Sequence, residues 1–439
     1  MQKTESKKPR NFDKYAIIIT ICFFLVVSFV TFYHHDYWID GDYLLYSNLG
    51  HDILDGNGKN VKMLNAGPGG PVFYAFLDSL TGNALLNAKL ISLLGGTGIV
   101  ALSYLIIKNI FGSKIALVGQ LFVVFSPRID IISLQTLNEI IPIFLIFGSF
   151  FFITKNQLKI SPIIIAGVLL GIAFMFRYQS AFILVAFVIF LLIQNKKIRT
   201  NLLYVAVLIL LFTAAASPVF LYNYSTHGTI LDSDPNFELM VKSKYKPSNE
   251  IIEEFKQKIA NNEVSGGYND PNLFLKNYFY NLFNHNPNKL FSFDTISSLS
   301  PIPTIPFLGL ILVFGALFYL LKIQLNRKNL MVLTGIFFST LFSVILFGDI
   351  SIHFFALIIL PIIGLTILNF NKIDKNLLPI LIAPAVYLVL ISIVPVSKPE
   401  HLLPIWIMIP ALSSVFFIQV IPKIISKITN TSKFPIREL

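Results

Sequence analysis

Repeated apolar runs are the feature that most restricts how this chain folds. The first run spans residues 16–33, and comparable runs recur as far as residue 421. A run of about twenty apolar residues matches the hydrocarbon thickness of a bilayer, and a soluble core could not bury so many of them. A mean hydropathy of +0.71 over the 439 residues agrees with this reading. The sequence therefore predicts an all-α membrane protein of the polytopic class.

Twelve membrane spans are predicted: 16–33, 88–107, 114–127, 134–153, 160–176, 180–194, 201–221, 305–321, 330–347, 354–369, 377–395 and 402–421. The third is short for a span. Residues 160–194 fit either one long tilted helix or a hairpin. The central "FRYQS" favours the hairpin, because a charge at the bilayer centre costs about 3 kcal/mol. Three regions follow: a transmembrane module (1–221), an outer loop region (222–304) and C-terminal transmembrane helices (305–439).

Basic residues set the expected orientation. With a cytoplasmic N-terminus, the tails and inner loops carry 21 of the 34 basic residues, whereas the four short outer loops carry only Arg128, Arg177 and Lys398. The positive-inside rule then places both termini in the cytoplasm and residues 34–87 and 222–304 outside the cell membrane. The net charge of +11 is explained by anchoring to membrane lipids, so it does not indicate nucleic-acid binding.

The first outer loop contains an unusual cluster of acids. Its segment "HDYWIDGDYLLYSNLGHDILDGNG" has five aspartates in a chain that is only 13% charged. The pattern predicts a surface helix from about residue 43 to 54, ended by Gly56, with small juxtamembrane helices expected at this face. Two interpretations of Asp40 and Asp42 stay open. Either residue is an N-cap of that helix, or it is a general base held beside a lipid-borne substrate.

Several ordered motifs follow this loop. They are "GPGGP" (67–71), "KLIS", "FGSKIAL", "SP", a glutamate on the next helix, "GVLLGIAFMFRYQSAF" (167–182), "EHLLPIWIMIPAL" (400–412) and, more loosely, "IHFFALIILPIIG" (352–364). In this order they resemble the GT-C class of membrane glycosyltransferases, in particular the superfamily of protein O-mannosyltransferases and lipid A aminoarabinose transferases. The resemblance covers roughly residues 15–200 and 350–420. Residues 222–304 have no counterpart in it.

The resemblance implies an inverting transfer from a polyprenyl- or dolichyl-phosphate sugar to a hydroxyl of a protein, lipid or glycan acceptor, on the extracytoplasmic side. No organic cofactor is implied, and a divalent metal is left open. The base of the family falls on Asp40 or Asp42. Here "DGD" replaces the usual adjacent acidic pair, so the choice stays open, with Asp42 preferred because an aromatic residue follows it.

Basic groups are expected to hold the departing phosphate. Arg177 is the first candidate, and its alternative role is that of a snorkelling interfacial arginine. Lys62, His353 and His401 are further candidates, although a lone histidine at an interface is commonly structural.

Glu139 is expected about nine residues into its span, where an acid is costly. We expect it to support the site by pairing with Arg128 or Arg177. A purely structural buried pair is the alternative.

Two other functional classes stay open. A polysaccharide polymerase or ligase also has many spans and one large outer loop, but such a loop is usually rich in arginine and residues 222–304 contain none. A secondary transporter would place its acids near the bilayer midplane, whereas most of the acids here lie at the outer surface. The chain has no GxxxxGK phosphate loop, no HExxH or CxxC motif, and no WWDYG motif of the oligosaccharyltransferase catalytic subunit. Its single cysteine, Cys22, excludes a disulfide framework.

Overall fold

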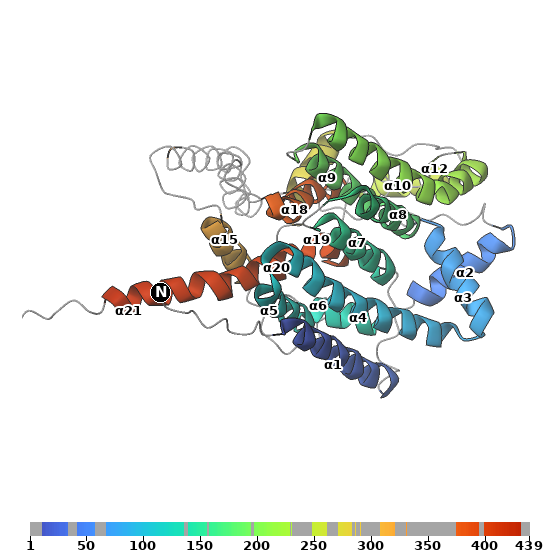
Figure 1. Cartoon of the computed structure of the whole chain (residues 1–439). Helices are drawn as coiled ribbons and strands as arrows, with labels where there is room; N and C mark the ends of the chain where they lie inside the picture. Colours follow the sequence, from blue (N-terminus) through green and yellow to red (C-terminus); the bar gives the residue numbers. More distant parts are fainter. Residues whose placement is uncertain are drawn as a thin grey trace, which may run out of the picture.

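The computed structural model shows a helical bundle (Figure 1). It describes residues 11–33, 42–57, 67–135, 139–155, 158–194, 197–228, 230, 248–260, 271–282, 286, 290, 308–320, 331, 375–394 and 399–431. The N-terminal helices are α1 (Phe12–Tyr33), α2 (Asp42–Leu54), α3 (Gly69–Thr81), α4 (Ala84–Phe111), α5 (Ser113–Val124), α6 (Pro127–Leu134), α7 (Ile140–Ile153), α8 (Ile160–Phe176), α9 (Ser180–Leu192) and α10 (Ile198–His227).

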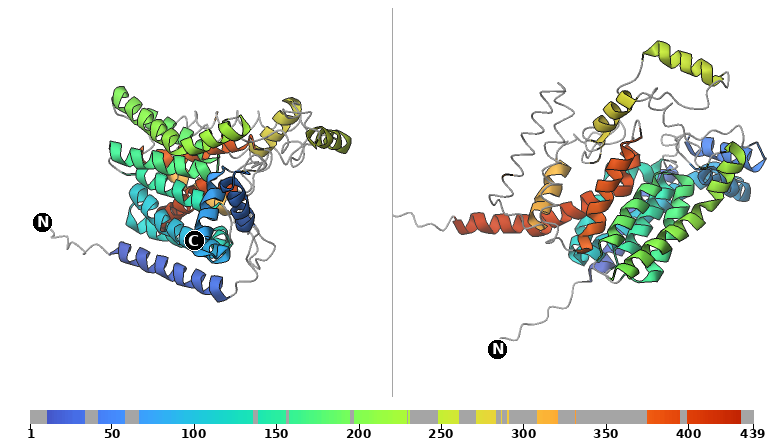
Figure 2. Two further views of the ribbon diagram at one scale, coloured as in Figure 1. Left: turned by 90° about the vertical axis from the view of Figure 1, so that its right-hand side faces the viewer. Right: turned by 90° about the horizontal axis from the view of Figure 1, so that it is seen from above.

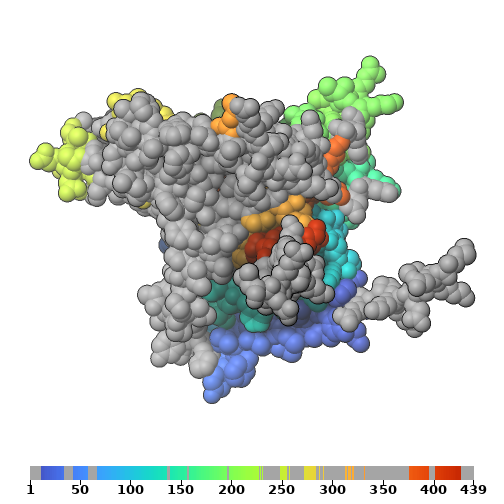
Figure 3. Space-filling model, turned by 90° about the vertical axis from the view of Figure 1, so that its left-hand side faces the viewer, coloured from blue at the N-terminus to red at the C-terminus, as the bar shows by residue number. Residues whose placement is uncertain are grey.

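The remaining helices follow α10 in the chain. They are α12 (Asn249–Ala260), α13 (Pro271–Tyr280), α15 (Leu308–Leu320), α18 (Leu378–Ile391), α19 (Leu403–Trp406), α20 (Met408–Val415) and α21 (Ile421–Thr431), with the short turns η4 (Lys375–Leu377), η5 (Pro399–Leu402) and η6 (Phe416–Val420). Both views in Figure 2 place α12 at the periphery, away from the main bundle. In the space-filling view, α1 lies along one edge of the molecule (Figure 3).

The described helices support the membrane assignment. Four of them are long and apolar enough to cross a bilayer: α1, α4, most of α10, and the segment Leu403–Ser426. Shorter apolar helices, α7, α8, α9 and Lys375–Ile391, lie among them. Two of the predicted spans, 330–347 apart from residue 331, and 354–369, fall outside the described residues, so the count of twelve stays a prediction.

The short predicted span at 114–127 is part of a bent pair. The axes of α5 and α6 differ by 59°, and the bend lies at Ser126 and Pro127. Proline has no backbone N–H and cannot continue the hydrogen-bond ladder of a helix, which explains the break there. Because α6 continues to Leu134 and α7 starts only at Ile140, the predicted start of the next span at residue 134 is wrong.

The hairpin predicted within residues 160–194 is confirmed. Helix α8 ends at Phe176, α9 begins at Ser180, and the Ser180 hydroxyl reaches back to the carbonyl oxygen of Leu170 at 3.4 Å. Two glycines of the "GVLLG" motif let α8 pack closely on α10. A Cβ on Gly167 would lie 2.9 Å from the carbonyl oxygen of Leu208, which is closer than a real Cβ atom approaches.

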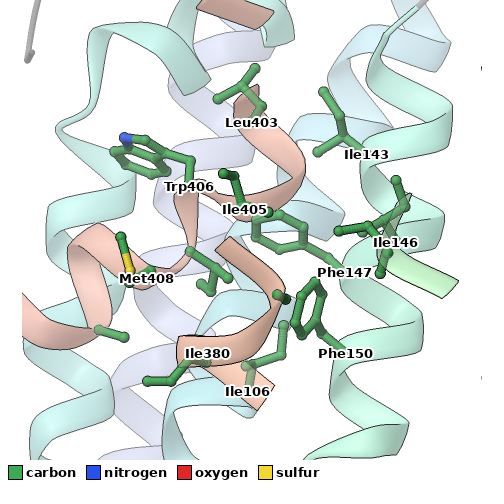
Figure 4. Close-up of a cluster of buried hydrophobic side chains, with 14 of the residues drawn as sticks. Ile106, Ile143, Ile146, Phe147, Phe150, Ile380, Leu403, Ile405, Trp406 and Met408 are labelled. Carbon is green, nitrogen blue, oxygen red and sulfur yellow. The ribbon is translucent and has the colours of Figure 1, made fainter. Parts of the chain in front are cut away.

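The apolar core joins the two halves of the chain. Helix α8 packs against α7 and α10, α4 against α5 and α7, and α9 against α18. Figure 4 shows Ile106 of α4, Phe147 and Phe150 of α7, Ile380 of α18 and Trp406 of α19 in one buried cluster. This contact brings the C-terminal helices against the N-terminal helices, with η5 between α18 and α19.

Candidate functional site

The predicted surface helix is present as α2, ending at Leu54 with Gly56 at a positive φ of 84°. It lies with α3 across one end of the bundle (Figure 1). A Cβ on Gly50 of α2 would overlap the carbonyl oxygen of Pro71, so glycine permits the two helices to cross in contact. Leu45 on the opposite side is 55% exposed, in keeping with an apolar face directed away from α3.

A buried carboxylate, Asp78 of α3, fixes α2 in place. It accepts a hydrogen bond from the Tyr43 hydroxyl at 2.9 Å and a short one from the Ser47 hydroxyl, both on α2. The amide nitrogen of Asn87 on α4 donates to the same carboxylate at 2.7 Å. Burial, and then the hydrogen bond to Asp78, raises the pKa of Tyr43, so this hydroxyl keeps the proton that it donates. Three helices therefore meet at one acid.

Aromatic rings continue this contact toward the end of α8. The rings of Tyr43 and Tyr74 lie with centroids 4.6 Å apart, and the ring of Tyr74 lies 6.3 Å from that of Phe176. Tyr74 is fully buried, and burial, followed by the nearby Glu139 charge, raises its pKa. Among the described residues, its hydroxyl has no hydrogen-bond partner. The first residues of α2 are thus connected by packed rings to the residue that precedes Arg177.

The "GPGGP" segment contacts the same place. The backbone N–H of Gly67 donates to the carbonyl oxygen of Phe176 at 3.1 Å. A Cβ on Gly67 would overlap the carbonyl oxygen of Met175, and one on Gly69 would lie 2.6 Å from the Met175 side chain. Glycine is required here because the chain passes directly over the last turn of α8. The start of α3 is therefore held beside Arg177.

Arg177 and Glu139 form a buried ion pair. Arg177 follows the last turn of α8 in an extended conformation, and its Nη2 bonds to Oε1 of Glu139, which immediately precedes α7. The two side chains are only 11% and 7% exposed. Of the two partners expected for Glu139, the structure shows Arg177. The expected position nine residues into a helix is wrong, since α7 begins only after Glu139.

A small cavity lies at this ion pair. Its lining includes Glu139, Arg177, Gln179, Ser180 and His401, and its volume of about 20 Å³ is the space of roughly one water molecule. His401 belongs to η5 and is 9% exposed, and its carbonyl oxygen accepts a 2.6 Å hydrogen bond from the Tyr387 hydroxyl. The structure thus brings together three predicted site residues, from just before α7, just after α8 and the C-terminal half.

The other predicted site residues are not part of this cavity as described. Arg128 lies in the first turn of α6 and is 2% exposed. Asp40, Lys62 and His353 fall outside the described residues, and for Asp42 only its place at the first position of α2 is described. Among the residues that the structure describes, no group of three or more His, Cys, Asp or Glu side chains is arranged to hold a metal ion.

The sequence analysis missed Asp78 and Tyr74. Asp78 lies in the apolar stretch "FYAFLDSL", so the cost of burying an acid, which drew attention to Glu139, applies equally to it. Tyr74 had no comparable signal, because an aromatic residue in an apolar run is normal.

Two comparisons with known proteins bear on this arrangement. The family model described as dolichyl-phosphate-mannose-protein mannosyltransferase matches residues 65–222, about a third of the chain. The crystal structure of ArnT from Cupriavidus metallidurans bound to undecaprenyl phosphate matches with a TM-score of 0.53 and 12% identity, over 94% of this chain and 61% of that one. The chain has the fold of the GT-C membrane glycosyltransferases.

The chain spans about three fifths of the length of the ArnT structure. The archaeal oligosaccharyltransferase AglB from Archaeoglobus fulgidus, in complex with an inhibitory peptide and a dolichol-phosphate, matches with a TM-score of 0.43 and 12% identity, over 98% of this chain and 53% of that one. No curated protein matches the sequence. The family match, residues 65–222, contains Asp78, Glu139 and Arg177, whereas His401 lies beyond it.

Proposed function

We propose that the chain is an integral membrane glycosyltransferase that moves a sugar from a polyprenyl-phosphate donor to an acceptor hydroxyl on the extracytoplasmic side. The observation that carries the proposal is the convergence of Arg177, Glu139 and His401 in one cavity. Gly67 contacts the last turn of α8 beside this cavity, and packed aromatic rings connect the same turn to α2, the helix that begins with Asp42. The undecaprenyl phosphate bound to ArnT supports a donor of this chemical class.

The reaction needs a base and a cation at neighbouring positions. The carboxylate of Asp42, or of Asp40, takes the proton of the acceptor hydroxyl, and the acceptor oxygen attacks the anomeric carbon of the sugar. The bond from that carbon to the donor phosphate oxygen breaks, and the lipid phosphate leaves with the electron pair. Attack on the face opposite the leaving group inverts the anomeric configuration. Arg177 opposes the negative charge that grows on the phosphate.

An arginine suits this role because its planar guanidinium matches two phosphate oxygens at once. The guanidinium has five N–H donors, and the described pair with Glu139 engages Nη2. Glu139 therefore orients Arg177 at this cavity. A phosphate is larger than the 20 Å³ cavity, so donor binding requires lining side chains such as Gln179 and His401 to move.

The experiment separates a base from a helix cap. Asparagine caps a helix about as well as aspartate but accepts no proton at neutral pH. We expect Asp42→Asn or Asp40→Asn to lower transfer about 100-fold or more while leaving thermal stability nearly unchanged. The matched control is Asp52→Asn, which changes an exposed carboxylate of the same helix and should keep normal transfer.

Transfer is measured in a deletion strain that expresses each variant, by mass spectrometry of lipid-linked sugars and glycoconjugates. The strain without the gene should accumulate the donor lipid and lose one glycoconjugate. An unaltered profile in that strain refutes the transferase proposal as a whole. Near-normal transfer by both asparagine variants refutes only the base assignment and leaves these aspartates as caps.

A further inference from the structure

A second cavity lies at the ends of α7 and α8 that are opposite to Glu139 and Arg177. Its volume is about 500 Å³, and it is lined where α7 and α9 end and where α8 and α18 begin. Helix α7 starts beside Glu139 and reaches this cavity at Ile153, a helical rise of about 21 Å for its 14 residues. This second cavity is therefore separate from the cavity at Arg177 and Glu139, and the inference drawn from it does not depend on the proposed function.

Three lysines line this cavity from three segments. Lys155 follows α7, Lys159 precedes α8, and Lys375 opens the turn before α18. Among the lining residues that the structure describes there is no acidic side chain, so three positive charges gather around one hollow. Like charges gathered around one hollow repel each other, and an anion placed between them removes that repulsion. The arrangement indicates an anion site.

Aromatic rings hold one of these cations at the site. The ammonium of Lys155 lies 5.0 Å from the ring centroid of Phe151 and 4.8 Å from that of Phe152. Such cation–π contacts reduce the freedom of a long side chain. Lys159 and Lys375 are exposed and able to follow a ligand, whereas Lys155 is half-buried.

The rest of the lining identifies the kind of anion. Ile153, Leu158, Phe190 and Pro379 are buried apolar side chains that line the same cavity as the lysines. A free inorganic anion makes no favourable contact with an apolar surface, whereas an amphiphile has a charged headgroup for the lysines and an apolar body for this wall. The cavity also lies where apolar helices end, which is the level of lipid headgroups. A membrane lipid with net negative charge fits both features.

We propose that this cavity binds the phosphate headgroup of an anionic phospholipid in the leaflet opposite the Arg177 site. With the predicted orientation this is the cytoplasmic leaflet. The phosphate lies among the three lysines, and the glycerol and upper acyl chains cover the apolar wall. A bound lipid would link the loop between α7 and α8 to the start of α18.

Native mass spectrometry of the full-length protein in detergent tests this with three probes: phosphatidylglycerol, phosphatidylcholine and inorganic phosphate. We expect one phosphatidylglycerol to be retained per chain, with weaker retention of the zwitterionic lipid and no competition from millimolar phosphate. Equal retention of both lipids overturns the charge recognition. Competition by inorganic phosphate shows a soluble-anion site and overturns the lipid assignment.

Variants locate the site. Replacing Lys155, Lys159 and Lys375 with glutamine should raise the dissociation constant for phosphatidylglycerol by about 10- to 100-fold. The double variant Lys159→Gln/Lys375→Gln changes only exposed side chains, so it keeps the test decisive if the triple variant folds poorly. Unchanged binding by a folded variant refutes the site.

The matched control removes the same charge elsewhere on the same predicted face. Lys14, Lys114 and Lys197 are exposed and are not among the lining residues. Their replacement with glutamine should leave phosphatidylglycerol binding within about twofold of the wild type if the cavity is the site. An equal loss in this control variant would mean that the lipid responds to overall charge, and the proposal would fail.

Discussion

Replacing Asp78 with alanine should release α2 from the bundle while leaving the membrane helices folded. The carboxylate accepts hydrogen bonds from Tyr43 and Ser47 of α2 and from Asn87 of α4. Without it, the two hydroxyls of α2 lose their acceptor in a buried place. Asn87 keeps its second contact, a 2.7 Å hydrogen bond to the hydroxyl of Thr81. The loss therefore falls mainly on the contact between α2 and α3.

The size of the effect follows from these contacts. A buried donor left without an acceptor costs about 1–3 kcal/mol, so the two hydroxyls of Tyr43 and Ser47 together cost about 2–6 kcal/mol. Since about 1.4 kcal/mol corresponds to tenfold, local opening of α2 should become at least about 30-fold more frequent. Burial is the largest cause of the raised pKa of Tyr43 and does not depend on Asp78, so this hydroxyl remains a protonated donor in the variant and cannot relieve the cost by ionising.

Hydrogen–deuterium exchange measures this opening directly. Peptides from residues 43–54 should exchange at least about 30-fold faster in Asp78→Ala than in the wild type, while peptides of α8 and α10 keep their rates. Asp78→Asn keeps one acceptor oxygen, so the exchange rate of these peptides should lie between those of Asp78→Ala and the wild type. Asp52→Ala removes an exposed carboxylate of α2 and should leave the exchange unchanged. Wild-type exchange in Asp78→Ala would refute the role of this acid in holding α2.

Three further predictions concern Arg177, Gly67 and the membrane topology. Arg177→Lys keeps the charge but loses the bidentate fork, so donor use should weaken by about 1–3 kcal/mol, and unchanged donor kinetics would reduce Arg177 to an interfacial anchor. Gly67→Ala should lower thermal stability by about 1–3 kcal/mol because its Cβ overlaps the end of α8, and a wild-type melting curve would contradict that contact. In a Cys22→Ser background, an impermeant thiol reagent should label a cysteine at Asn249 but not one at Thr431, and the reverse pattern would invert the proposed orientation.

The parts of the fold that depend on local sequence were predictable. The extent of α2 follows from the "DGDYLLYSNLGHDILDG" pattern, because a positive-φ glycine just after the last turn ends a helix through local conformation. The hairpin at Arg177 follows from the cost of a charge inside an apolar run. In both cases the deciding interaction is between residues close in the chain or between one residue and the bilayer.

The parts that depend on convergence were not predictable from one sequence. Asp78 is 31 residues from Ser47, and nothing local selects that partner. The position of Glu139 was misplaced because the apolar pattern continues through residue 134 and hides the end of α6 and the later start of α7. Periodicity shows that a segment is apolar, but where a helix stops inside such a segment is decided by contacts with other helices.

The two halves of the chain need each other at the candidate site. Arg177 and Glu139 come from the module that the family model matches, whereas His401 comes from a segment more than 170 residues beyond the end of that match. Helix α18 packs on α9, and α19 packs on α7 and on η5. The packing that buries Trp406 of α19 therefore also sets the position of His401 in η5 (Figure 4). A buried ion pair is held by its surroundings, because two desolvated charges are stable only where the geometry around them is fixed. The C-terminal helices therefore act as one wall of the site, and a substitution in the core at Trp406 should disturb Arg177 without touching it.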